Sequence, residues 1–187
     1  MSIEKNRCPW CGTEPIYVKY HDEEWGQPIH DDRLLFEFLV LESFQAGLSW
    51  LTVLKKRENF RKAFANFDAK KVSKFDQTKF DALMQDAGII RNRLKIEAAI
   101  NNAQRFLEIQ KEFGSFDKYI WSFTGGKTIV NKPKTLKDLP AKTAISDAMS
   151  KDMGLRGFKF RGSTICYAFM QAVGMVDDHL EDCWRKN

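Results

Sequence analysis

The side chains best suited to hold a metal ion gather at the two ends of this 187-residue chain. The N-terminal part contains Cys8 and His21, and the C-terminal part contains His179 and Cys183. His179 and Cys183 have i, i+4 spacing, which places both side chains on one face of a helix. Two thiolates and two imidazoles form a closed tetrahedral set of the kind that structural zinc prefers. Such a site would join the two ends of the chain, so metal binding would contribute directly to folding.

Cys11 allows other interpretations of the cysteine and histidine residues at the two ends of the chain. Cys8 and Cys11 have C-x-x-C spacing, which by itself slightly favours Cys11 over His21 as a ligand. The same spacing occurs in thioredoxin-like redox proteins, but no βαβ pattern surrounds it here. The remaining alternative is that these are scattered surface residues. Pairs at both ends of a chain with only three histidines count against it.

A single carboxylate, Glu42, ends a strongly apolar stretch and precedes Trp50. An unpaired charge is costly to bury, so a carboxylate in this position is unusual. Four further aromatic residues lie close in sequence to the N-terminal metal ligands: Trp10, Tyr17, Tyr20 and Trp25. A carboxylate beside aromatic faces would suit a flat, cationic ligand. The alternative is that Glu42 faces solvent or pairs with a basic residue, while the aromatic residues pack in the core.

Basic residues follow a glycine at the junction between two predicted helices. Gly88 permits a tight turn, and backbone N–H groups at the start of the next helix can hold a phosphate. Arg91, Arg93 and Lys95 would add charge-assisted contacts. This pattern suits a helix-hairpin-helix module that binds the DNA backbone, although a helix-ending glycine beside a solvated basic face is the simpler interpretation. Two other basic stretches could extend such a surface: residues 55–62 and residues 156–161.

An all-α fold is predicted to position these side chains. Asp31 and Asp32 can cap a buried helix that is interrupted at Gly47, and the apolar pattern resumes at Trp50. Further helices are predicted over residues 68–75, 77–87, 96–114, 116–123, 146–153 and 163–173.

Three of these helix boundaries rest on single residues. Gly88 is expected to end the helix over 77–87, while Ser146 and Ser163 are expected to cap the last two helices. Alternation of period two is nearly absent. One short irregular strand is expected near residues 127–130, inside a loop-rich stretch.

Composition limits the class of protein. With 43% hydrophobic and 29% charged residues, a single globular domain over residues 1–187 is expected. No apolar run approaches the ~18 residues of a spanning helix, so no membrane association is expected. The first ten residues contain no apolar signal segment, which favours a cytoplasmic location where thiols stay reduced. The net charge of +5 permits a polyanionic partner, and a monomer is the expected state.

Taken together, these segments resemble the 3-methyladenine DNA glycosylase I family of the helix-hairpin-helix glycosylase superfamily. The resemblance extends from about Cys8 to Cys183 and rests on many long segments in the same order. The matching segments are Cys8-Pro9-Trp10, residues 20–26, residues 41–50, residues 86–91, residues 156–160, Asp178-His179 and Cys183.

The resemblance implies roles for individual residues. It implies a structural zinc ion held by Cys8, His21, His179 and Cys183, which favours His21 over Cys11. It implies a base pocket around Glu42, Tyr20 and Trp50, with Trp10 and Trp25 nearby. Within the hairpin segment (residues 77–107), Gly88, Arg91, Arg93 and Lys95 would contact the DNA backbone. Leu48 would be the wedge that fills the gap left by an extruded base.

The reaction implied by the resemblance is hydrolysis of the N-glycosidic bond of 3-methyladenine in double-stranded DNA. The products would be an abasic site and the free base, and no lysine stands out as a Schiff-base nucleophile for a lyase step. Asp117 is expected to have no catalytic role and to cap a helix. Two alternatives remain: a zinc-stabilised module that binds DNA without catalysis, and a helical interaction protein whose aromatic residues are all core.

Overall fold

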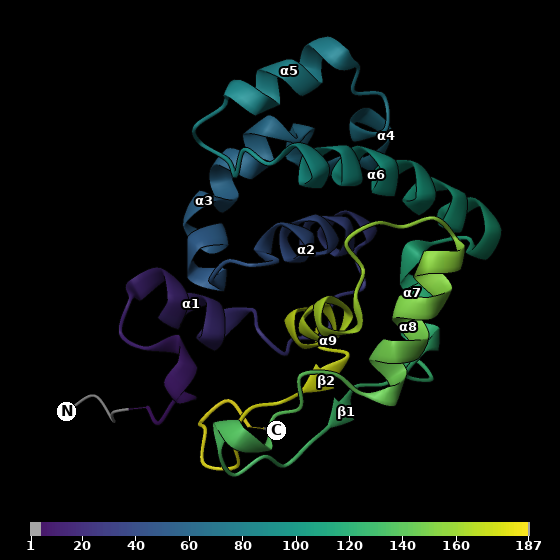
Figure 1. The fold of residues 1–187 in the computed structure, drawn as a ribbon. Coiled ribbons are helices and arrows are strands. Elements are labelled where there is room, and N and C mark those ends of the chain that lie inside the picture. The colour runs from purple at the N-terminus through teal and green to yellow at the C-terminus, as the bar shows by residue number, and fades with distance from the viewer. Residues whose placement is uncertain (1–4, 187) are drawn as a thin grey trace.

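Helices make up most of residues 5–186, the part of the chain that the computed structural model describes (Figure 1). The α-helices are α1 Pro15–Glu23, α2 Asp32–Gln45, α3 Trp50–Ala63, α4 Ala69–Val72, α5 Gln77–Gln85, α6 Arg93–Phe113, α7 Phe116–Ser122, α8 Ala144–Leu155 and α9 Ser163–Ala172. Short 3-10 turns occur at η1 Pro9–Cys11, η2 Ala65–Phe67 and η3 Leu136–Asp138. None of the described helices combines the length and apolarity that crossing a membrane requires.

The expected short strand is present and has a partner that the sequence did not indicate. Strand β1, Ile129–Val130, pairs in parallel with β2, Val176–Asp177. Ile129 lies opposite Val176 in this two-stranded sheet. The sheet therefore ties the loop-rich stretch to the segment that carries the C-terminal metal-ligand candidates.

Helix α2 is the centre of the core and lies between α6 and α9 (Figure 1). Its residues 35–44 are all buried, including Glu37 and Glu42. The Asp31 side chain caps its N-terminus by accepting a hydrogen bond from the Leu34 N–H at 2.9 Å, as expected. Beyond its C-terminus, Gly47 adopts a φ of +77°, a left-handed conformation that glycine reaches without strain.

Three predicted helix boundaries were wrong in detail. Helix α5 ends at Gln85, before Gly88, and Gly88 does not have the positive φ of a helix-ending glycine. Thr143 caps α8, and the Ser146 hydroxyl accepts the Thr143 N–H in a reciprocal capping box. Ser163 is the first residue of α9, whose N-cap position is Gly162.

The two ends of the described chain lie close together at one side of the molecule (Figure 1). The backbone N–H of Trp184 donates a hydrogen bond to the Asn6 carbonyl at 2.9 Å. This contact brings the segment containing Cys8 beside the segment containing Cys183. The fold thus provides the close approach of the termini that a shared metal site needs.

Gly174 provides a stability test of the packing between α9 and the segment that follows α1. Its φ is +72°, and an added Cβ would lie 2.3 Å from the backbone carbonyl carbon of Gln27. We expect Gly174→Ala to lower the free energy of unfolding by about 3 kcal/mol or more, because backbone atoms cannot yield. Gly125→Ala is the matched control, since Gly125 has a φ of +65° but open space around it. Urea unfolding should show a cost near 1 kcal/mol for the control, and equal costs would contradict the steric argument.

Candidate functional site

A cavity of about 240 Å³ opens beside Glu42 and is walled mainly by aromatic side chains. It is lined by Trp10, Tyr17, Tyr20, Trp25, Glu42, Gln45, Trp50, Leu136, Leu139, Ala168 and Gln171. Helix α1 contributes Tyr20, α2 contributes Glu42, and α3 begins at Trp50. The Tyr20 and Trp50 ring centroids lie 5.4 Å apart. The space is therefore apolar and flat-walled, with a carboxylate on its surface.

Three polar atoms in this wall lack partners within the described residues. They are the Trp10 Nε1, the Trp50 Nε1 and the Glu42 Oε2, all of which are buried. An unpaired buried donor or acceptor costs about 1–3 kcal/mol. Two N–H donors and one carboxylate oxygen, on residues that line the cavity, thus have no partner in the described chain. Such convergent polar groups in an apolar space are typical of a small-molecule site.

Burial controls the ionisation of the cavity wall. It raises the pKa of the Glu42 carboxyl to about 8, because no charge or donor compensates the lost hydration. It also raises the pKa of the Tyr20 hydroxyl well above its usual value. A cation that entered the cavity would favour the ionised form of Glu42. The solvent-facing alternative for Glu42 is therefore wrong, since only 3% of the residue is exposed.

The structure gathers all five residues of the predicted base pocket in this one cavity. Tyr17, which the sequence places in the same aromatic cluster, also lines the cavity, whereas the remaining lining residues were not predicted. Gln45 had a detectable signal, because it lies three residues after Glu42 and so on the same helical face. Leu136 and Leu139 had none, since they reach the cavity from the loop-rich stretch between β1 and α8.

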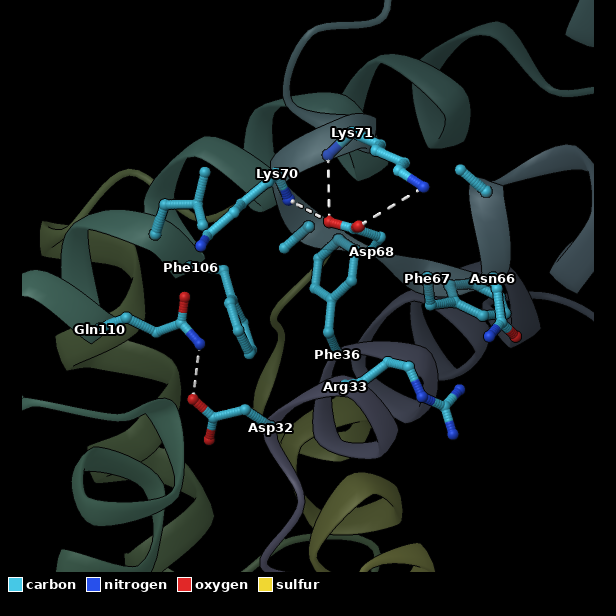
Figure 2. Close-up of a pocket in the computed structure, with 13 residues that line it drawn as sticks. Asp32, Arg33, Phe36, Asn66, Phe67, Asp68, Lys70, Lys71, Phe106 and Gln110 are labelled. Atoms are coloured by element: carbon cyan, nitrogen blue, oxygen red, sulfur yellow. Dashed lines mark hydrogen bonds and ion pairs between the residues drawn. The ribbon is translucent and has the colours of Figure 1, made fainter.

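A larger cavity, of about 430 Å³, lies on another part of the surface between α2, α4 and α6 (Figure 2). Its carboxylates, Asp32 and Asp68, already accept hydrogen bonds from other groups of the protein. Asp68 accepts the N–H groups of Lys70 and Lys71, and Asp32 accepts a hydrogen bond from the Gln110 amide at 2.6 Å (Figure 2). It contains none of the predicted site residues, so size alone does not identify the functional cavity.

A buried cluster of metal-ligand side chains lies next to the aromatic cavity. Candidate ligand atoms of Cys8, His21 and Cys183 lie within 4.8 Å of one another. The Cys183 Sγ is 3.5 Å from the His21 Nε2. His179 lies beside this group, with its ring centroid 5.2 Å from that of His21. Its Nε2 is buried and has no partner in the described chain.

Both histidines are oriented as metal ligands usually are. The His21 Nδ1 lies 2.8 Å from the Asp22 Oδ1, and the His179 Nδ1 lies 2.8 Å from the Asp177 Oδ1. A carboxylate that accepts the Nδ1–H leaves the Nε2 lone pair for a metal. The chemistry of the donor set therefore fits zinc: two thiols, two imidazoles and a carboxylate behind each imidazole.

The aromatic cavity and this cluster share a wall. The Trp25 ring centroid is 4.6 Å from that of His179, and the Trp10 ring centroid is 5.3 Å from that of His21. Cys11 is buried but lies outside the group of three. Its Sγ has the Gly12 carbonyl as a contact at 3.8 Å. The geometry therefore favours His21 over Cys11.

The hairpin segment presents two arginines to solvent. Arg91 lies in the turn between α5 and α6. Arg93 is the first residue of α6, and 61% of its side chain is exposed although it lies 3.4 Å from the exposed Glu97 carboxylate. The Asn92 side chain caps α6 by accepting the Lys95 N–H at 3.1 Å. At Gly88, an added Cβ would lie 2.9 Å from the Asp86 Oδ1. Gly88 thus lies at a close approach between side chains, and it does not end the helix.

Lys95 does not lie where the sequence analysis expected it. It is only 6% exposed, and its ammonium donates hydrogen bonds to the Phe44 and Ala46 carbonyls. The expectation that Lys95 contacts the DNA backbone is therefore wrong for this structure. Leu48, by contrast, is 42% exposed in the loop between α2 and α3. Its position suits the predicted wedge.

Three arginines of the other basic stretches are committed to ion pairs. The Arg57 Nε lies 2.5 Å from the buried carboxylate of Glu37, and Arg61 contacts the same carboxylate at 2.7 Å. Arg156 pairs with Glu112 and Asp152. These three charges therefore do not extend a DNA-binding surface as expected.

Asp117 also differs from expectation. Ser115 caps α7, so Asp117 is not the cap. The Asp117 carboxylate lies 2.7 Å from the His30 Nδ1. Asp117 and His30 are not among the residues that line the aromatic cavity.

Comparisons with known proteins agree with the geometry. The family model described as methyladenine glycosylase matches residues 10–186. A DNA-3-methyladenine glycosylase of Haemophilus influenzae is 52% identical over 177 residues, covering 95% of this chain and 96% of its own. A crystal structure of a 3-methyladenine DNA glycosylase I superposes with a TM-score of 0.95 at 46% identity, covering 97% of this chain and all of its own. A variant of such an enzyme in complex with 3-methyladenine has a TM-score of 0.94 at 40% identity, with coverages of 97% and 98%. The chain therefore belongs to the methyladenine glycosylase family.

Proposed function

We propose that this protein removes 3-methyladenine from alkylated double-stranded DNA by hydrolysis and leaves an abasic site. The observation that carries the proposal is the aromatic cavity, in which the Glu42 carboxylate and two indole N–H groups have no protein partner. A related glycosylase binds the free base 3-methyladenine. The aromatic cavity of this chain has the flat walls and the carboxylate that would suit such a base.

Access to the lesion requires that the nucleotide leave the duplex. A base within stacked DNA is out of reach, so glycosylases extrude it into a pocket. Arg91, Arg93 and the N–H groups at the start of α6 would hold the backbone. Leu48 would enter the stack at the vacated position. A damaged base that stacks poorly costs less to extrude, which adds selectivity.

Selection in the cavity follows from charge. Methylation at N3 gives the purine a positive charge, and aromatic faces attract cations. The flipped base would lie against Trp50 and Tyr20, with its donor edge toward Glu42. Unmodified adenine carries no such charge and would gain neither the cation–π attraction nor a charge-assisted hydrogen bond.

The cationic base is already an activated leaving group. The bond between the sugar C1′ and the purine N9 breaks, and its electron pair neutralises the charge on the purine. The oxygen of a water molecule bonds to C1′ and releases a proton. No Schiff base is part of this scheme, so the protein would be monofunctional.

A structural zinc ion completes the proposal. Cys8, His21, His179 and Cys183 would hold it, and the ion would tie the two ends of the chain together. Burial raises the pKa of the Cys8 thiol in the protein alone. A coordinated zinc ion reverses this preference, because a thiol deprotonates on binding. The zinc ion would hold Trp10 and Trp25 in place, because these two rings lie between the metal cluster and the cavity.

Chromatography of bases released from methylated duplex DNA tests the proposed reaction. We expect the purified protein to release 3-methyladenine and to leave 7-methylguanine in the DNA. Glu42→Gln should bind the same DNA with little release. If the wild-type protein bound DNA with a steep salt dependence and released no base, it would be a DNA-binding module without this activity.

A further inference from the structure

A lysine is buried at the base of the hairpin segment. Lys95 lies in the first turn of α6 and is 6% exposed. Its Nζ donates hydrogen bonds to the Phe44 carbonyl at 2.8 Å and to the Ala46 carbonyl at 2.5 Å. No carboxylate in the described part of the chain pairs with it, and burial lowers its pKa. An ammonium without a counter-ion is costly to bury.

The two acceptors lie at the end of α2 that carries the pocket. Phe44 and Ala46 flank Gln45, which lines the aromatic cavity, and Glu42 lies one turn earlier. The last carbonyls of a helix lack partners within the helix, and a cation is favourable there. The Lys95 ammonium therefore fixes the end of α2 just where the loop bearing Leu48 begins.

A second lysine connects the same parts in the opposite direction. Lys56, on α3, donates hydrogen bonds to the Ala87 carbonyl at 2.9 Å and the Gly88 carbonyl at 3.3 Å. The turn before α6 is thus held by α3, and the loop before α3 is held by α6. The Lys95 connection joins the hairpin segment to the end of α2 and to the Leu48 loop (residues 46–49). The Lys56 connection joins the hairpin segment to α3, the helix that follows this loop. The two parts are linked at both ends and should move together.

We propose that Lys95 is a positioning residue that holds the Leu48 loop and the end of α2 in register with the hairpin segment. Contact of the hairpin with the DNA backbone would then set the place at which Leu48 enters the duplex and Glu42 meets the extruded base. This inference rests on the proposed glycosylase function. Lys95 itself touches neither DNA nor base in this scheme.

The test compares variants on three separate properties. Lys95→Met keeps most of the side-chain volume and removes the ammonium, while Lys95→Gln retains an N–H donor. Arg93→Met serves as the example of a lost phosphate contact, and Lys111→Met, at the exposed far end of α6, controls for the lost charge. The measurements are single-turnover base release, affinity for free 3-methyladenine, and the salt dependence of binding to a duplex with a tetrahydrofuran abasic-site analogue.

We expect Lys95→Met to lower single-turnover release about tenfold to a hundredfold, because misplacement of about 1 Å can cost that much. Affinity for the free base should stay within about twofold, since the cavity wall is intact. The salt slope should also stay at the wild-type value, whereas Arg93→Met should reduce it by about 1. Lys95→Gln should be intermediate in release, and Lys111→Met should behave as wild type.

A 2-aminopurine base beside the abasic-site analogue reports wedge insertion directly. Its fluorescence should rise less with Lys95→Met than with the wild-type protein, because the Leu48 loop is no longer fixed. If Lys95→Met fails to fold, Lys95→Gln takes its place in every measurement.

Several results would overturn the inference. A salt slope reduced by about 1 would make Lys95 a phosphate contact. A parallel loss of free-base affinity would make it part of the pocket, and unchanged release from a folded variant would leave it no functional role. Wild-type release is measured first. Its absence would contradict the proposed function itself, which separates the two failures.

Discussion

Glu42→Gln should abolish most base release and at the same time make the protein more stable at neutral pH. The carboxylate is the charged group in the cavity, and a charge-assisted hydrogen bond to a cation contributes about 1.5–3 kcal/mol. Its loss should lower single-turnover release about tenfold to a hundredfold. Glutamine fills the same volume, so circular dichroism should show an unchanged fold.

The stability gain has a defined pH window. The pKa of Glu42 rises from 4.5 to about 8 on folding, because burial disfavours the charged carboxylate. Below pH 4.5 the group is protonated in both states, so it adds no penalty. Between about pH 4.5 and 8 the unfolded state loses its proton first, and wild-type stability falls relative to the variant. The advantage of Glu42→Gln should therefore grow through this window to several kcal/mol and level off above it.

Comparison of urea unfolding at pH 5 and pH 8 checks this prediction. Only the difference between the two proteins matters, since every other titrating group is common to both. Glu42→Asp is a useful second variant, because it keeps a charge at a shifted position. Normal release by Glu42→Gln would show that the carboxyl is not functional. A stability difference independent of pH would show that the carboxyl is not buried in solution.

The parts of the fold that the sequence predicted are those set by local patterns. Asp31 and Gly47 mark the limits of α2, and Gly114 ends α6 in the expected left-handed conformation. These signals act over a few residues, since a cap or a positive φ depends on its immediate neighbours. The two terminal groups of cysteine and histidine were also detectable, because few other residues of these types compete for the assignment.

The residues whose surroundings were predicted wrongly from the sequence depend on partners that are distant in the sequence. Arg57 and Arg61 belong to basic stretches, yet both are held by Glu37 on a different helix. Lys95 occupies a position where a charged residue usually faces solvent, and only the packing of α6 against the end of α2 directs it inward. Charge patterns alone do not distinguish a solvated face from an internal one.

The left-handed turn at residues 65–67 is the clearest case of tertiary control. Ala65, Asn66 and Phe67 all have positive φ values near 50°, although none is glycine. Such a conformation costs about 1–2 kcal/mol per residue, so no local signal predicts it. Burial of Phe64 and Phe67, whose rings stack 6.1 Å apart, offsets this cost. Prediction of the base pocket is limited in the same way, because the path of a loop brings Leu136 and Leu139 to the pocket and no local pattern indicates that path.

Removal of zinc should loosen the whole fold. If Cys8, His21, His179 and Cys183 hold the ion as proposed, chelation separates the two ends of the chain and leaves four buried polar groups without their partner. Binding energy at a structural zinc site is folding energy. We expect a strong chelator to lower the melting temperature by about 10 °C or more.

Cys183→Ser and Cys11→Ser form a matched pair for this prediction. Both thiols are buried near the termini, but only Cys183 belongs to the cluster with Cys8 and His21. Elemental analysis should find about one zinc per chain in Cys11→Ser and far less in Cys183→Ser, with melting temperatures that follow the zinc content. Equal loss of zinc in the two variants would place Cys11 among the ligands. A metal-free protein that melts as the loaded one does would contradict a structural site.

Activity should distinguish a structural from a direct role for the ion. Trp10 and Trp25 separate the cluster from the cavity, so the ion would influence the base only by holding these rings in place. Base release by the chelated protein should therefore fall in step with the fraction that has unfolded. At a temperature where the chelated protein remains folded, release should be close to that of the loaded protein. Complete loss of release without loss of fold would instead require that the cluster acts on the pocket while α1 and α9 stay in place.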